Sequence, residues 1–168
     1  DGSGNGNNAV LQNGATYAAG HIGQAFSLDG TDDAVRIPAS GSLNVGADNG
    51  LTIETWIKPS DLSGPRPIVE FSANSNAAGS IGMHLYASVS PTVTGQGHLY
   101  ANLVDAAGGF HIIHTGPNAL TAGVYQHVVL TYDKTTGNAA LYVNGAVAVS
   151  SNLGIFTAKT TADMYLGA

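Results

Sequence analysis

Short stretches of alternating apolar and polar residues, separated by turn residues, run along most of the chain. Residues 51–58, LTIETWIK, alternate with a period of two and end at Pro59. Because successive side chains of a strand point to opposite faces of a sheet, this period predicts a half-buried β-strand. Similar stretches predict further strands at residues 25–28, 34–37, 68–71, 81–89, 97–104, 110–115, 125–132, 139–143, 145–149 and 163–166.

The breaks between these stretches carry residues that favour tight turns. Asp29-Gly30 and Asn144-Gly145 both follow predicted strands, and such pairs adopt the positive φ angles that hairpins require. Many short strands at this spacing indicate a sandwich or a barrel rather than alternating strands and helices. The Gly- and Asn-rich residues 1–24 and the proline-containing residues 59–67 are looser. We find no repeat and no domain boundary, so residues 1–168 are expected to form one domain.

Composition and charge narrow the range of partners and compartments. Five Lys plus Arg stand against eleven Asp plus Glu, giving a formal net charge of −6. So few cations disfavour nucleic acid and anionic membranes as partners, and no apolar run approaches the ~20 residues of a membrane-spanning helix. The chain has no cysteine, so it has neither disulfides nor thiolate metal ligands. Few charges and 23 glycines are typical of extracellular β-rich proteins, so we expect a secreted domain at a cell or virion surface.

Four groups of residues stand in a characteristic order over nearly the whole chain. They are DGSGNGNN at 1–8 with GQAFSLDGTDDAV at 23–35, LTIETWIKP at 51–59, YQHVVLTYD at 125–133, and ALYVNG at 140–145 with MYLGA at 164–168. Together they resemble the laminin-G-like jelly-roll domains of the concanavalin-A-like lectin/glucanase superfamily, which usually have tryptophan in place of Tyr125. The resemblance implies an all-β fold, a two-sheet antiparallel jelly-roll sandwich.

The alternation within the segments agrees with such a sandwich. Residues 125–132 are apolar on both faces, which predicts a central strand, and Asn144-Gly145 predicts a hairpin. Members of the family commonly continue beyond the segment at 164–168 with a closing strand, whereas this sequence ends at Ala168. We therefore expect an unpaired sheet edge or an open groove, completed by a strand from another chain or from a C-terminal continuation.

The carboxylates argue against catalysis. The superfamily includes glycoside hydrolases, whose chemistry needs two carboxylates about 5–5.5 Å apart for retention and farther apart for inversion. This sequence has only Glu54 and Glu70, on separate predicted strands, and it has no Gly-x-Ser-x-Gly motif. A Ser-His-Asp triad stays open, because its members need not be adjacent in sequence. We predict a non-enzymatic domain without catalytic residues; the remnant of a glycoside hydrolase or lyase is the weaker alternative.

A metal site is predicted near the N-terminus. Asp1, Asn5 and Asn7 offer oxygen ligands on a glycine-rich loop, and calcium takes six to eight oxygen ligands. The resemblance implies a structural Ca²⁺ site at this loop, with a further acidic ligand from the closing segment. The alternative is a solvated turn of Asp and Asn residues. Residues 29–33 hold a second acidic cluster, for which a plain hairpin turn is the alternative.

Histidine and tyrosine recur on three successive predicted strands. By parity, each strand places its His and Tyr residues on one face, and neighbouring strands of a meander would align them across the sheet. Aromatic rings with hydrogen-bonding tips can stack on and grip a sugar; the alternative is ordinary cross-strand pairs on a solvated face. His111 and His114 fall on opposite faces, which argues against zinc. The predicted ligand-binding residues are His84, Tyr86, His98, Tyr100, Asn102 and His111.

The sequence therefore predicts a non-catalytic extracellular binding module whose function is carbohydrate recognition. The alternative is a structural or assembly subunit of a surface filament or virion, with contacts to a neighbouring protein subunit as its main role. The aromatic face favours the first function, and the expected open edge favours the second.

Overall fold

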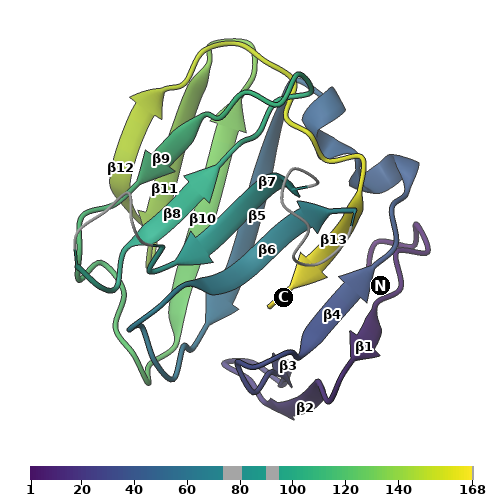
Figure 1. Ribbon diagram of the computed structural model, residues 1–168, viewed down its shortest axis with the longest axis vertical. Coiled ribbons are helices and arrows are strands. Elements are labelled where there is room, and N and C mark those ends of the chain that lie inside the picture. The colour runs from purple at the N-terminus through teal and green to yellow at the C-terminus, as the bar shows by residue number, and fades with distance from the viewer. Residues whose placement is uncertain (74–80, 90–94, 168) are drawn as a thin grey trace.

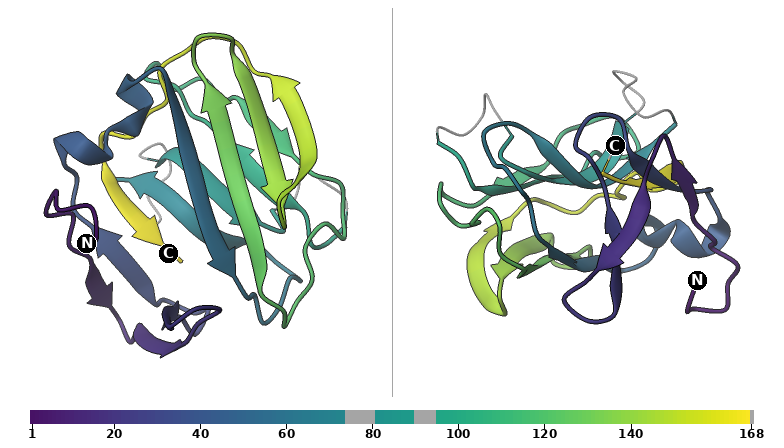
Figure 2. Two further views of the ribbon diagram at one scale, coloured as in Figure 1. Left: turned by 180° about the vertical axis from the view of Figure 1, so that it is seen from behind. Right: turned by 90° about the horizontal axis from the view of Figure 1, so that it is seen from below.

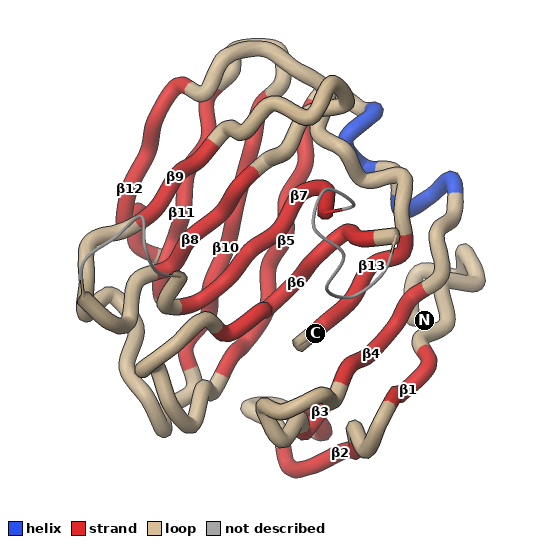
Figure 3. Tube along the Cα trace, in the orientation of Figure 1, coloured by secondary structure: helices blue, strands red, loops and turns tan. Residues whose placement is uncertain are grey.

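The computed structural model describes residues 1–73, 81–89 and 95–167. Within them the chain forms thirteen β-strands and two short 3-10 helices, η1 (Gly41–Leu43) and η2 (Val45–Ala47). The strands build two antiparallel sheets that pack face to face, with a separate hairpin of β2 (Thr16–Ala19) and β3 (Gln24–Ser27) at one end (Figure 1). Strands and loops account for nearly all of the described chain (Figure 3). The predicted all-β, two-sheet antiparallel jelly-roll sandwich is confirmed.

The larger sheet has seven strands in the order β1-β4-β13-β6-β7-β8-β9. Strands β6 to β9 follow one another in sequence and in space, which makes the meander that the alternation suggested. The bounds are β1 (Val10–Gln12), β4 (Ala34–Ile37), β6 (Arg66–Ser72), β7 (Ile81–Ala87), β8 (Leu99–Asn102), β9 (Ile112–His114) and β13 (Asp163–Leu166).

The smaller sheet has four strands in the order β12-β11-β10-β5. Strand β10 lies between two neighbours, as its apolar character on both faces predicted. The predicted hairpin between β11 and β12 is also present, with Asn144 at φ 51° and Gly145 at φ 81°. The bounds are β5 (Gly50–Ile57), β10 (Gln126–Asp133), β11 (Asn138–Val143) and β12 (Ala146–Asn152).

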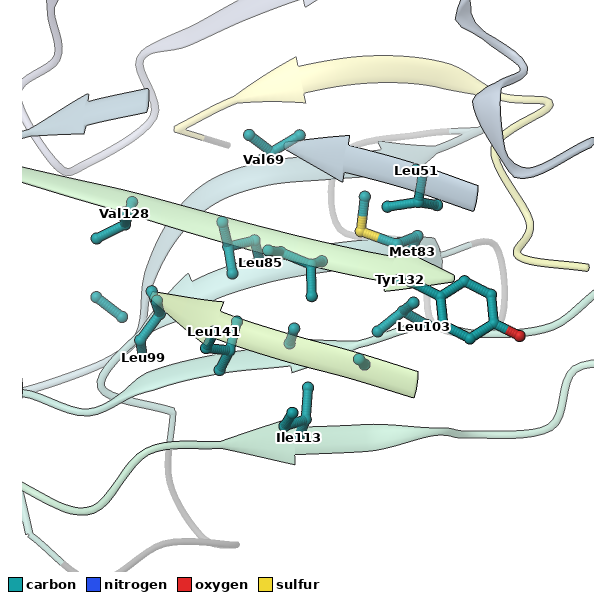
Figure 4. Close-up of a cluster of buried hydrophobic side chains, with 14 of the residues drawn as sticks. Leu51, Val69, Met83, Leu85, Leu99, Leu103, Ile113, Val128, Tyr132 and Leu141 are labelled. Atoms are coloured by element: carbon teal, nitrogen blue, oxygen red, sulfur yellow. The ribbon is translucent and has the colours of Figure 1, made fainter. Parts of the chain in front are cut away.

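The hydrophobic core fills the space between the two sheets. Met83, Leu85 and Leu99 point inward from the larger sheet, and Leu141 meets them from the smaller one (Figure 4). Leu130 of the smaller sheet belongs to the same core cluster. All five side chains are fully buried. Burying large aliphatic side chains stabilises a fold by about 1.5–3 kcal/mol each. The alternate residues of the same strands therefore face outward, and they carry the polar chemistry of the molecule.

The last strand of the chain does not lie at an edge. Strand β13 pairs with both β4 and β6 in the interior of the larger sheet, while β5 has a partner on only one side within the described residues. The larger sheet extends past β5 (Figure 2). Between β5, β13 and the β2–β3 hairpin lies a groove of about 1170 Å³, here named the edge groove. Its apolar lining includes Phe26, Ile53, Ile57, Met164 and Leu166.

Candidate functional site

The outward side chains of β6 to β9 form a single polar face on the larger sheet. Cross-strand pairing places Glu70 beside His84 and His84 beside Asn102, and in the neighbouring row Tyr86 beside Tyr100. His114 of β9 pairs with Tyr100 and extends that row. Because Val69, Leu85 and Ile113 of these strands point into the core, the alternation requires the polar residues to point away from it. The polar face comprises Glu70, His84, Tyr86, Tyr100, Asn102 and His114.

Ring contacts and hydrogen bonds hold this polar face in order. The His84 ring lies 5.0 Å from the Tyr86 ring and 6.0 Å from the Tyr100 ring, measured between centroids. The Tyr86 hydroxyl donates a hydrogen bond to Oε2 of Glu70. Nδ1 of His84 lies 3.0 Å from the carbonyl oxygen of Gly82 and therefore carries the proton in this contact. The opposite nitrogen, Nε2, is left as an acceptor.

Burial sets the protonation of the polar face. Glu70, Tyr100 and Asn102 are buried, while His84 and Tyr86 are half-buried. Burial, reinforced by Glu70, raises the pKa of Tyr86 well above its ordinary value, and burial also raises the pKa of Tyr100. Burial lowers the pKa of His84, against the opposing effects of the Gly82 carbonyl and Glu70. At neutral pH His84 is therefore a neutral imidazole with an acceptor nitrogen, and Tyr86 and Tyr100 keep their hydroxyl protons, which suits binding better than proton abstraction.

Four of the predicted ligand-binding residues come together on this face: His84, Tyr86, Tyr100 and Asn102. His98 lies outside the strand and does not join this face. It precedes β8, is 1% exposed, and places Nε2 2.7 Å from the carbonyl oxygen of Val89. Strand parity holds only inside a regular strand, and the chain turns at Gly97, where φ is 69°.

The expectation that His111 lies on the same face is wrong. The His111 ring stacks on Phe156 at 3.6 Å, and its Nε2 lies 3.0 Å from Oδ2 of Asp105. His111 shares the parity of Ile113, which is buried in the core, so its side chain turns toward the other sheet. His114 takes the position on the polar face instead. Its pairing with Tyr100 depends on the register between β8 and β9, which no local pattern reveals.

The two glutamates lie in different sheets, Glu54 on β5 and Glu70 on β6. Glu54 points outward from the smaller sheet, with Nε2 of His127 3.9 Å from its carboxylate. Because the hydrophobic core separates the two sheets, the two glutamates do not form the close carboxylate pair of a retaining glycosidase.

The N-terminal residues predicted to bind metal use their oxygens on their own loop. The Asp1 carboxylate accepts hydrogen bonds from the backbone N–H of Ser3 and of Asn7, both at 2.9 Å. Oδ1 of Asn7 accepts from the hydroxyls of Ser40 and Ser42 at 2.7 and 3.1 Å. These bonds make a turn of Asp and Asn residues, and a calcium ion at Asp1, Asn5 and Asn7 stays a prediction. Asn5 is exposed and belongs to the same loop.

The second acidic cluster has the better donor set for a metal. Carboxylate oxygens of Asp29, Asp32 and Asp33 lie within 4.8 Å of one another. Asp33 is buried, and its Oδ2 accepts the backbone N–H of Asp29 at 2.9 Å. Three carboxylates are hard oxygen donors of the kind that calcium prefers, so these residues fit a divalent cation.

Two antiparallel sheets packed over one core, with a half-buried aromatic face on the outside, define a lectin-type jelly-roll. A family model described as the concanavalin A-like lectin/glucanases superfamily matches residues 29–168, and the chain belongs to this family. A search of curated protein sequences finds no match. No helix among the described residues has the length and apolarity to cross a membrane.

Solved structures share the fold at low sequence identity. Domain 4 of AbnA, an extracellular arabinanase from Geobacillus stearothermophilus solved with arabinotriose, has 19% identity and a TM-score of 0.69, over 100% of this chain and 77% of that one. The CBM40 of a Ruminococcus gnavus sialidase bound to α2,3-sialyllactose has 15% identity and a TM-score of 0.57, over 80% of this chain and 77% of that one. The structure named HCR/D-Sa-GBL1/C has 14% identity and a TM-score of 0.66, over 95% of this chain and 38% of that one.

Proposed function

We propose that this domain is a non-catalytic carbohydrate-binding module that acts outside the cell and binds a glycan on the polar face. The observation that carries the proposal is the ordered group of His84, Tyr86 and Tyr100 across two strands, in which the His84 ring centroid lies 5.0 Å from that of Tyr86 and 6.0 Å from that of Tyr100. The similar folds of an arabinanase domain solved with arabinotriose and a CBM40 solved with sialyllactose support this ligand class.

The chemistry of the polar face suits a sugar. The half-buried rings of His84 and Tyr86 offer apolar surface to the C–H groups of a pyranose or furanose. Nε2 of His84 accepts a hydrogen bond from a sugar hydroxyl, and exposed His114 extends the contact area at the edge of the sheet. Buried Glu70 holds the Tyr86 ring through its hydroxyl, and buried Asn102 is itself held because its Oδ1 accepts the His111 backbone N–H at 3.1 Å.

The experiment is to compare His84→Ala and Tyr86→Ala with Tyr17→Ala, which removes an exposed tyrosine from the β2–β3 hairpin. Binding is measured on a glycan array and by calorimetry with arabinotriose and α2,3-sialyllactose. We expect at least about tenfold weaker binding for the two polar-face variants, equivalent to ~1.4 kcal/mol. Circular dichroism confirms that each variant is folded. Unchanged glycan binding by folded His84→Ala and Tyr86→Ala would exclude the polar face as the binding surface.

A second candidate function is assembly, and the edge groove favours it. Among the described residues, the outer edge of β5 has no strand partner and lies beside apolar side chains, which suits an extended strand supplied by a neighbouring subunit. Light scattering over a range of protein concentrations tests this function. Growth of the particle mass with concentration, abolished by Ile57→Lys in the groove but kept by Val147→Lys on β12, would support assembly. A constant monomer mass would argue against a second copy of this chain as the partner.

We also propose that Asp29, Asp32 and Asp33 hold a structural Ca²⁺ ion. The donor set of three carboxylates supports this assignment. A bound ion would neutralise their mutual repulsion and fix the loop that leads into β4.

A further inference from the structure

The outer face of the smaller sheet carries a shallow hollow of about 810 Å³ that the polar face does not include. The left panel of Figure 2 shows this sheet in front, on the opposite side of the sandwich from β6 to β9. We name it the sheet hollow. Its floor and wall are made by Thr52 of β5, Thr131 of β10, Ala140 and Tyr142 of β11, and Ser150 of β12.

The register of the four strands creates the hollow. Thr52 pairs with Thr131, Thr131 with Ala140, and Ala140 with Ser150, so one row across the whole sheet consists of small side chains. In the next row Tyr142 stands between Val129 and Val147 and is half-buried. A row of small residues beside a tyrosine leaves a depression with an aromatic wall.

The polar groups of the rim and the floor differ in their bonding. At the rim, the hydroxyls of Thr135 and Thr136 donate to the Asp133 carboxylate at 2.6 and 2.8 Å. Also at the rim, Nδ2 of Asn152 donates to Oδ1 of Asn138 at 2.9 Å.

On the floor and wall, by contrast, hydroxyl groups have no hydrogen-bond partner anywhere in the described part of the chain. They belong to Thr52, Thr131, Tyr142 and Ser150. The rim is therefore held in place by its own hydrogen bonds, while the floor offers free donors and acceptors to a ligand.

The charge of the hollow restricts the chemistry of that ligand. No Lys or Arg lines it, and its one carboxylate, Asp133, already accepts the bonds of Thr135 and Thr136. These bonds lower the pKa of Asp133, so the group stays ionised and repels anions. A ligand that matches free hydroxyls and one aromatic ring, without charge, is a neutral carbohydrate.

We infer that the sheet hollow is a second glycan-binding surface, selective for neutral polysaccharide chains, with Tyr142 as its stacking residue. The inference rests on the proposed function only for the ligand class, because it uses a different surface on the opposite sheet. Two binding surfaces on opposite faces would allow one domain to bridge two chains and to gain affinity through multivalency.

The test uses Ser150→Arg, which fills the hollow from an exposed position, and Ala148→Arg as the matched control on the same strand outside the lining. Retardation in native gels containing arabinan, dextran or polygalacturonate measures binding. We expect a neutral polysaccharide to retard the wild type and the variants Ala148→Arg and His84→Ala. The variant Ser150→Arg should bind that polysaccharide at least about tenfold more weakly. Polygalacturonate, which is anionic, should not bind the sheet hollow of the wild type or of any of these variants. Equal thermal unfolding of the two arginine variants confirms folding.

Three results would overturn the inference: Ser150→Arg retains wild-type retardation, His84→Ala abolishes all binding of neutral polysaccharides, or no neutral polysaccharide retards the wild type. The proposed function fails separately. If sialyllactose binding is lost in His84→Ala while Ser150→Arg behaves as wild type, the polar face is supported and the hollow is excluded.

Discussion

Removing the hydroxyl of Tyr132 is expected to destabilise the fold measurably. Tyr132 is buried, and its hydroxyl accepts the backbone N–H of Phe156 at 3.0 Å while lying 2.9 Å from the carbonyl oxygen of Gly154, to which it donates. Its ring stacks on Phe156 at 4.7 Å between centroids, a contact that phenylalanine preserves. The change Tyr132→Phe therefore removes hydrogen bonds and leaves the packing in place.

The magnitude follows from the two bonds that are lost. A typical intramolecular hydrogen bond contributes about 0.5–1.5 kcal/mol, and leaving a buried partner unsatisfied costs somewhat more. Two such bonds give a loss of about 2 kcal/mol in the free energy of unfolding for Tyr132→Phe. For a domain of this size that corresponds to about 4–8 °C in Tm.

The matched control is Tyr142→Phe, because the Tyr142 hydroxyl has no bond to any described residue. Urea unfolding followed by fluorescence, with the midpoint and slope fitted separately, measures both variants. We expect Tyr142→Phe to stay within about 0.5 kcal/mol of the wild type, as surface substitutions usually do. If Tyr132→Phe is equally neutral, the hydroxyl does not link the β12–β13 connection to the core, and the reasoning fails.

Three further predictions concern acid sensitivity, metal and core. The hydrogen bond from His111 is the main cause that lowers the pKa of Asp105. The ionised carboxylate therefore stabilises the fold above about pH 4, and this contribution is lost as the pH falls through the lowered pKa. The urea midpoint of Asp105→Asn should be lower than that of the wild type at neutral pH, the difference should shrink toward pH 2, and a constant difference would contradict this. EDTA should lower the Tm of the wild type and of Asp48→Asn but not of Asp33→Asn; no effect on the wild type would exclude the metal. Leu130→Ala, at a fully buried position, should cost about 3–5 kcal/mol in urea unfolding, and a loss under 1 kcal/mol would show that β10 is not central to the core.

The sequence predicted what depends on local alternation. Ile53 and Leu130 fall on the inner faces of β5 and β10 because period-two burial is written into each strand separately. The same rule correctly placed His84 with Tyr86 and Tyr100 with Asn102, since both pairs lie inside regular strands. It failed for His98, which stands just outside β8 where the chain turns and parity no longer applies. His111 keeps the parity of Ile113, but the register between β8 and β9 turns that face toward the core and sets His114 beside Tyr100.

Only the tertiary structure decided which strands far apart in the sequence became neighbours. That β13 lies between β4 and β6 depends on packing between residues more than 90 positions apart, and alternation within one strand carries no information about it. The sheet hollow likewise requires Thr52 and Ser150 to enter one row, and a bulge between Leu141 and Tyr142 sets Tyr142 opposite Val147 in the next row. Alternation thus determined the strands and their inward faces, while long-range register determined the surfaces that they present to a ligand.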